Sequence, residues 1–206
     1  MKELTLADIN LEGIRAVVFD LDGTLYDKRW LPWQLVWGDL RHAGLLASER
    51  KARRLLRGRY FGDADTFYQT LFSCIAQARH IPYMQAKEWY NATYMPLMEK
   101  TLRTCHHAGA FVEPLLKALR QRGIRTAVFS DYSCVDEKLK ALRISPEWFD
   151  FREAAPDLGG LKPNCRVYEK LMQLLQVAPD EALMIGDRDD TDGVGARAVG
   201  MKFLRV

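Results

Sequence analysis

The chain has 206 residues, of which 48% are hydrophobic and 28% charged, values near the average of globular proteins. Its formal net charge of +3 is too small to indicate a nucleic-acid-binding protein. No apolar run reaches the ~18 residues that a membrane-spanning helix needs. Residues 1–13 contain three acids and no apolar centre, so we expect no signal peptide, and the cysteines form no C-x-x-C pair. These features favour a cytoplasmic protein with reduced cysteines.

Apolar strands alternate with helices in the two outer parts of the chain. The expected strands cover residues 14–20, 126–130, 151–155, 182–185 and 202–206, and the expected helices cover residues 114–122, 135–142, 165–176 and 193–199. This alternation predicts an α/β fold with a Rossmann-like, doubly wound parallel sheet and helices on both faces. We expect the helix at 135–142 to expose Glu137, Lys138 and Lys140 to solvent.

Residues 28–108 interrupt this alternation and are expected to be wholly helical. Ser48 and Asp65 are the candidate N-caps of two of these helices. The sequence therefore predicts an α/β core domain formed by residues 1–27 and 109–206, with an inserted all-helical domain at residues 28–108.

Two patterns stand out in the helical segment. Trp30, Trp33 and Trp37 recur at helical spacing, which favours packing in the core of the inserted domain over stacking on a substrate. A dense basic run follows. It consists of Arg50, Lys51, Arg53, Arg54, Arg57 and Arg59. Such a run is most often a solvated helix face, and the alternative is a surface that attracts polyanions.

Two carboxylates follow the first expected strand directly. Asp20 and Asp22 stand two residues apart, and Gly23 permits a sharp turn just after them. Ionised carboxylates this close repel each other. The arrangement is typical of a site in which a cation neutralises one acid and the other exchanges a proton.

Three further motifs follow in order. Ser130 ends the second strand, Lys162 stands in a loop before a helix, and Asp187 follows the strand at 182–185, with Asp192 later in the same acidic turn. The carboxyl ends of parallel strands meet at one edge of a sheet, where ligands of such folds bind. We therefore expect these side chains to lie in one site.

These four motifs, together with the segment from Gly193 to Met201, resemble those of the haloacid dehalogenase-like (HAD) hydrolase superfamily, in its phosphatase branch with a helical cap after the first motif. The resemblance implies that Asp20 is a nucleophile that forms an aspartyl-phosphate, and that Asp22 first protonates the leaving oxygen and then activates water. It also implies that residues 28–108 form a mobile cap, with hinges at residues 26–28 and 104–108.

The resemblance assigns the remaining roles as well. The phosphate would be bound by Ser130, Lys162 and the backbone N–H of Asp131. Mg²⁺ would be held by Asp20, Asp187, the backbone carbonyl of Asp22 and, through water, Asp192, which could instead orient Lys162. We interpret Asp189 and Asp190 mainly as solvated loop residues.

The implied reaction is the hydrolysis of a small phosphorylated metabolite. Asp22 favours phosphoryl transfer over carbon–halogen cleavage, because a halide leaves without a proton. Two alternatives stay open: a phosphomutase, which is weakened because residues 30–34 lack the cap histidine of such members, and a non-catalytic binding module that uses the basic helix. Nucleic acid is an unfavoured partner, no membrane is expected, and the oligomeric state is not predicted.

Overall fold

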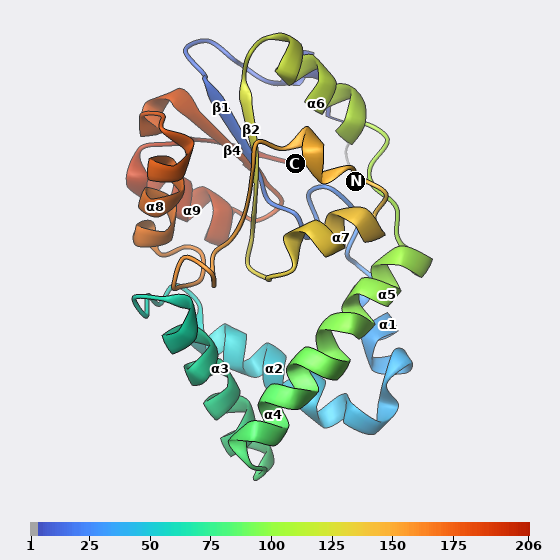
Figure 1. The fold of residues 1–206 in the computed structure, drawn as a ribbon. Helices are drawn as coiled ribbons and strands as arrows, with labels where there is room; N and C mark the ends of the chain where they lie inside the picture. The colour runs from blue at the N-terminus through green and yellow to red at the C-terminus, as the bar shows by residue number, and fades with distance from the viewer. Residues whose placement is uncertain (1–3) are drawn as a thin grey trace.

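A five-stranded parallel sheet lies at the centre of the α/β part of the protein (Figure 1). The structure is a computed structural model that describes residues 4–206. We predicted that residues 1–3 belong to the core domain and to a chain start without a signal peptide. These three residues lie outside the described range. The strand order is β3-β2-β1-β4-β5. The strands are β1 (Ala16–Phe19), β2 (Arg125–Ser130), β3 (Phe151–Ala154), β4 (Ala182–Gly186) and β5 (Lys202–Arg205).

Helices cover both faces of this sheet, which confirms the doubly wound prediction. In Figure 1, α6 and α7 lie on one side of the strands, and α8 and α9 lie on the other. The three central strands are buried almost along their whole length, as expected for parallel strands that are covered twice. The helices are α6 (Val112–Gln121), α7 (Val135–Ala141), α8 (Cys165–Leu175) and α9 (Val194–Val199).

The segment between β1 and α6 is helical, as predicted, and lies at the carboxyl edge of the sheet (Figure 1). Its helices are α1 (Leu31–Gly38), α2 (Ala43–Leu56), α3 (Ala64–Arg79), α4 (Tyr83–Trp89) and α5 (Met95–Cys105). A π-helical turn, Tyr90–Tyr94, joins α4 to α5 without a break. We refer to α1–α5 together as the helical insertion.

Both predicted caps in the helical insertion are wrong. Asp63, not Asp65, caps α3, because its side chain accepts the N–H of Thr66. Ser48 lies inside α2, where its hydroxyl donates to the carbonyl of Gly44 one turn earlier. A serine can satisfy its hydroxyl in this way within a helix, so its presence alone did not locate the helix start.

The two chain crossings into the helical insertion lie side by side. Tyr26 and Ala108 form an antiparallel bridge, and the two crossings are also tied by a ring contact between Tyr26 and His106. His106 Nδ1 lies 2.9 Å from the carbonyl of Asp27, and Nε2 lies 2.6 Å from Gln34 Oε1. This buried histidine therefore connects both crossings to α1.

The tryptophans at the start of α1 and within it do not pack in a core, so that prediction is wrong. Trp30, Trp33 and Trp37 are 65%, 63% and 74% exposed, whereas Leu31 and Leu35 supply the buried side of the helix. Almost every residue of α1 is apolar, so helical periodicity could not identify which side faces inward.

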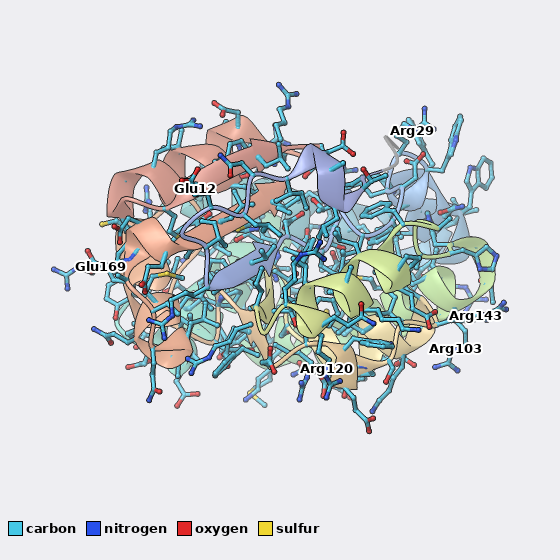
Figure 2. The ribbon with its side chains drawn as sticks, turned by 90° about the horizontal axis from the view of Figure 1, so that it is seen from above. Glu12, Arg29, Arg103, Arg120, Arg143 and Glu169 are labelled. Carbon is cyan, nitrogen blue, oxygen red and sulfur yellow. The ribbon has the colours of Figure 1, made fainter. Side chains whose placement is uncertain are left out.

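Most charged side chains are exposed to solvent, among them Glu12, Arg120, Arg143 and Glu169, which are labelled in Figure 2. Among residues 4–206, no helix combines the length and the apolar character that crossing a lipid bilayer requires.

Candidate active site

Asp20 is the residue that directly follows β1, and it is almost fully buried. Thr24, in the turn that Gly23 opens, donates its hydroxyl to Asp20 Oδ2 at 3.1 Å. The same hydroxyl accepts the backbone N–H of Asp187 at 3.1 Å. Thr24 thus joins the ends of β1 and β4, and it fixes one oxygen of Asp20 close to Asp187.

Lys162 reaches into the same place from the loop before α8. Its buried Nζ lies 2.7 Å from Asp20 Oδ1 and 2.6 Å from Asp192 Oδ1, and it also donates to the carbonyl of Phe129. Although burial disfavours the charged form, the carboxylates of Asp192 and Asp20 raise the pKa of Lys162 well above its usual value. Lys162 therefore brings a permanent positive charge to Asp20.

Asp22 lies beside Asp20 and is held by three donors. Tyr26 donates its hydroxyl to Oδ1 at 2.6 Å, and Ser130 donates to Oδ2 at 3.1 Å. Lys138 Nζ lies 2.6 Å from Oδ1 and 2.5 Å from Oδ2. Burial alone would raise the pKa of Asp22, but the charge and hydrogen bonds of Lys138, with the Tyr26 hydroxyl, leave it below its usual value.

Lys138 corrects a prediction. We expected it on the solvated side of its helix, but its side chain is 1% exposed and points at Asp22. Glu137 and Lys140, named with it, are exposed as expected. The reason is geometric: α7 starts close to the end of β2, so its inner side faces the site, and the buried ammonium is neutralised there by Asp22.

An acidic cluster marks the end of β4. Asp20, Asp187 and Asp192 each offer a carboxylate oxygen within 4.8 Å of the others. One oxygen of Asp187, Oδ1, is buried and has no hydrogen-bond partner. Burial raises the pKa of Asp187, and the nearby Lys28 ammonium, which lowers this pKa, offsets only part of the effect. Clustered carboxylates with an unpartnered oxygen fit a hard divalent cation, which takes oxygen ligands.

Lys28 already contacts two of the oxygens that were predicted as metal ligands. Its Nζ lies 2.7 Å from Asp187 Oδ2 and also donates to the backbone carbonyl of Asp22. Gly23 makes room for this side chain, because a Cβ there would lie 2.7 Å from Lys28 Nζ. No motif in the sequence had pointed to Lys28 as a residue of the site.

Asp192 is buried, and its two oxygens are used by Lys162 and by the N–H of Arg188. Burial raises its pKa, and the negative charge of Asp20 adds to that effect. Asp189 and Asp190 are exposed, as expected, and pair with Arg197 and Arg188 at 2.8 and 2.5 Å. They point away from the acidic cluster into ion pairs on the surface.

Ser130 ends β2 next to Asp22, and Asp131 follows it. The Ser130 hydroxyl accepts the N–H of Tyr132 at 3.0 Å, which closes the turn. Asp131 accepts the N–H of Lys162 at 3.0 Å on its carboxylate and a guanidinium N–H on its carbonyl. The side chain of Asp131 therefore positions the Lys162 loop, a contact that the sequence analysis missed.

That guanidinium belongs to Arg53, which the sequence analysis placed on a solvated face. Arg53 is buried, pairs with Glu49 one turn earlier, and donates to the carbonyl of Asp131 and the hydroxyl of Tyr90 at 2.7 Å each. Its guanidinium carbon lies 4.0 Å from the centre of the Tyr132 ring. The prediction was wrong for Arg53 because Glu49 supplies a buried counter-charge, whereas Lys51 and Arg59 are exposed as expected.

A cavity of about 530 Å³ opens above these residues, between the sheet edge and the helical insertion. Asp20, Asp22 and Lys162 lie in its wall on the sheet side. The insertion contributes mainly apolar side chains, among them Leu35 and Met98. The structure thus brings together Asp20, Asp22, Ser130, Lys162, Asp187 and Asp192, all of the predicted side chains, and it adds Tyr26, Lys28 and Lys138.

This chain is similar to known hydrolases. A family model described as haloacid dehalogenase-like hydrolase matches residues 14–200. The glyceraldehyde 3-phosphate phosphatase of Pyrococcus furiosus is 25% identical over 94% of this chain and 81% of the relative. Pyrophosphatase PpaX of Bacillus mycoides is 24% identical over 94% of this chain and 83% of the relative.

Solved structures share the fold. A HAD phosphatase from Thermococcus onnurineus superposes with a TM-score of 0.59 at 20% identity, over 94% of this chain and 86% of that one. A 2-haloacid dehalogenase from Pseudomonas syringae superposes with a TM-score of 0.64 at 21% identity, over 93% and 86%. Because the family model covers most of the chain, the protein belongs to the haloacid dehalogenase-like hydrolases.

Proposed function

We propose that this protein is a Mg²⁺-dependent phosphatase that hydrolyses a small phosphorylated metabolite through an aspartyl-phosphate on Asp20. The observation that carries the proposal is the cluster of Asp20, Asp187 and Asp192 with the Lys162 ammonium on two of its members. Relatives named as phosphatases support the same class of reaction.

The acidic cluster would hold the metal ion. Asp20 and Asp187 would contribute carboxylate oxygens, including the unpartnered Oδ1 of Asp187, and Asp22 would contribute its carbonyl after Lys28 withdraws. Asp192 would act through water. When bound, the ion supplies the charge neutralisation that lets an anionic nucleophile approach an anionic phosphate.

The chain's own residues would do the rest. Lys162, Ser130 and the N–H of Asp131 would hold the phosphoryl oxygens, so that Asp20 attacks in line with the leaving oxygen. Because Lys162 and Thr24 each bond one Asp20 oxygen, the carboxylate is oriented before the substrate arrives.

Asp22 would supply the proton that the leaving alkoxide needs and later take one from the attacking water. Lys138 favours its ionised form, which suits the second step. A bound phosphate brings negative charge beside Asp22, which favours protonation for the first step. A carboxyl group in this position serves an alkoxide leaving group and not a halide, so we infer phosphate-ester hydrolysis although a dehalogenase shares the fold.

The helical insertion would act as the cap. We propose that residues 28–108 move about the paired crossings at residues 26–28 and 104–108, closing the 530 Å³ cavity over the bound substrate.

Release of inorganic phosphate from an aryl phosphate tests the proposal, with Mg²⁺ and with EDTA. We expect metal-dependent release that Asp20→Asn abolishes, whereas Asp189→Asn, an exposed acid in the same turn as Asp192, retains it. After an acid quench, the peptide that contains Asp20 should carry the phosphate. Release that persists in Asp20→Asn would overturn the proposal.

A further inference from the structure

A second cavity, of about 370 Å³, adjoins the one above Asp20 and is lined mainly by arginine. We call it the arginine pocket. Its arginines are Arg50, Arg53, Arg54 and Arg57 from α2 and Arg188 from the turn after β4. Five residues line both cavities: Arg50, Asp131, Tyr132, Lys162 and Arg188. The two cavities therefore meet at the lysine that we propose as a ligand of the phosphate.

Three of these arginines are engaged by neighbours. Arg53 is bound to Glu49 and to the carbonyl of Asp131, as described above. Arg57 and Arg188 share a single carboxylate, that of Asp190, at 3.1 and 2.5 Å. One acid between two guanidinium groups leaves an excess of positive charge on this side of the pocket.

The other two arginines have no hydrogen-bond or ion-pair partner among residues 4–206. Arg50 and Arg54 are one helical turn apart, so they share a face of α2. The carboxylate that lines the pocket, Asp131, is occupied by the N–H of Lys162. Both arginines are exposed, and both line the arginine pocket together with Lys162. Two guanidinium groups without a partner suit an oxyanion, because guanidinium pairs bidentately with carboxylate and phosphate.

We propose that the arginine pocket binds a second anionic group of the substrate. This inference rests on the proposed function and narrows it: the substrate is a small organic phosphate ester that carries another phosphate or a carboxylate. The reacting phosphate lies at Asp20, the second oxyanion lies against Arg50 and Arg54, and the organic part between them lies along the apolar wall of the larger cavity. A nucleic acid is less suited, because its phosphates need an extended surface, whereas these arginines line one small cavity.

Binding of phosphonates, which have no ester bond to hydrolyse, tests the inference without turnover. Three series of increasing chain length are compared by calorimetry: alkylphosphonates with one anion, ω-phosphonoalkanoates with a second carboxylate, and α,ω-alkane bisphosphonates with a second phosphonate. At one chain length, we expect a second anion to lower Kd at least ~10-fold, the effect of one charge-assisted contact. The two bis-anionic series then show which oxyanion the pocket prefers.

Arg54→Gln is the decisive variant, because Arg54 lines the arginine pocket and not the cavity above Asp20. It should remove most of the gain from the second anion. Arg59→Gln is the matched control: an exposed arginine of the same basic run that lies outside the pocket lining. Melting temperatures of both variants check that the fold is retained.

The inference is overturned if no phosphonate binds, or if a second anion lowers Kd at no chain length. It is also overturned if Arg54→Gln and Arg59→Gln reduce the gain in affinity from the second anion equally, which would indicate a general effect of surface charge. Its failure differs from failure of the proposed function. A protein that hydrolyses an aryl phosphate but ignores the second anion loses only the arginine pocket, whereas one that hydrolyses no ester loses the phosphatase assignment.

Discussion

Lys138 Nζ lies 2.6 and 2.5 Å from the two carboxylate oxygens of Asp22, so a helix on one face of the sheet holds the acid that follows its central strand. The pair is nearly enclosed, with exposed side-chain fractions of 1% for Lys138 and 16% for Asp22. A contact this close fixes both the direction and the charge of the carboxylate.

Substitution of Lys138 should therefore slow the reaction more than it weakens substrate binding. Lys138→Met removes the counter-charge of Asp22 and leaves the carboxylate held by Tyr26 and Ser130 alone. We expect kcat for an aryl phosphate to fall ~10²-fold with little change in KM, the cost of a misplaced catalytic group. Lys140→Met, at an exposed position of the same helix, is the control. Equal kcat values in the two variants would contradict a positioning role.

Removal of Lys28 should strengthen metal binding. Its ammonium contacts the Asp22 carbonyl and Asp187 Oδ2, two oxygens that we assign to the metal. A divalent cation must displace it, so Lys28→Met should lower the Kd for Mg²⁺ by ~10-fold, which corresponds to about 1.4 kcal/mol. Calorimetric titration without substrate measures this change. Lys51→Met, on the exposed side of α2, should leave the Kd as in the parent protein; a weaker affinity in Lys28→Met would show that Lys28 supports the site instead.

Arg53 should be essential for stability. Arg53→Met leaves the Glu49 carboxylate buried without a counter-charge, which costs about 3–5 kcal/mol of the free energy of unfolding. Urea denaturation measures the loss, and adding Glu49→Gln should restore part of it. Arg54→Met, at an exposed position, should change stability by no more than ~0.5 kcal/mol. A double variant no more stable than Arg53→Met alone would refute the pairing.

His106 should make stability depend on pH. Burial lowers its pKa below the ordinary 6.5, against the hydrogen bond to Asp27. The unfolded chain therefore binds more protons than the folded one between the folded pKa and 6.5, so stability rises with pH in that window and is fully present above it. His106→Gln should flatten the dependence of the melting temperature on pH below about 6.5, and exposed His107→Gln should not. A profile unchanged by His106→Gln would exclude this histidine as the source.

The fold, and the meeting of the motif residues at one edge of the sheet, could be predicted because their signals are local. Each motif ends or follows an apolar strand, and parallel strands bring such ends to one edge, so Asp20 and Asp187 meet although they are far apart in the sequence. Lys162 does not end a strand, and it was predicted from its place in the order of the four motifs.

Three of the wrong predictions, those for Lys138, Arg53 and the tryptophans, share a cause: tertiary neighbours decide which side of a helix is inside. Lys138 lies among other charged residues in a short helix, so the sequence did not distinguish it from its exposed neighbours. Only its pairing with the Asp22 carboxylate makes its burial favourable. Arg53 is buried for the same reason beside Glu49. In α1 the opposite problem arises: apolar residues surround the helix, so the sequence could not show that Trp33 lies outside.

The chain leaves the sheet near Tyr26 and returns to it near Ala108. The bridge between these two residues places the two points in direct contact. A segment attached through one such junction can be lengthened, shortened or replaced by recombination without shifting the register of any strand. The helical insertion, and with it the range of substrates that fit the cavity, can therefore change in evolution while the acids at the strand ends stay in place.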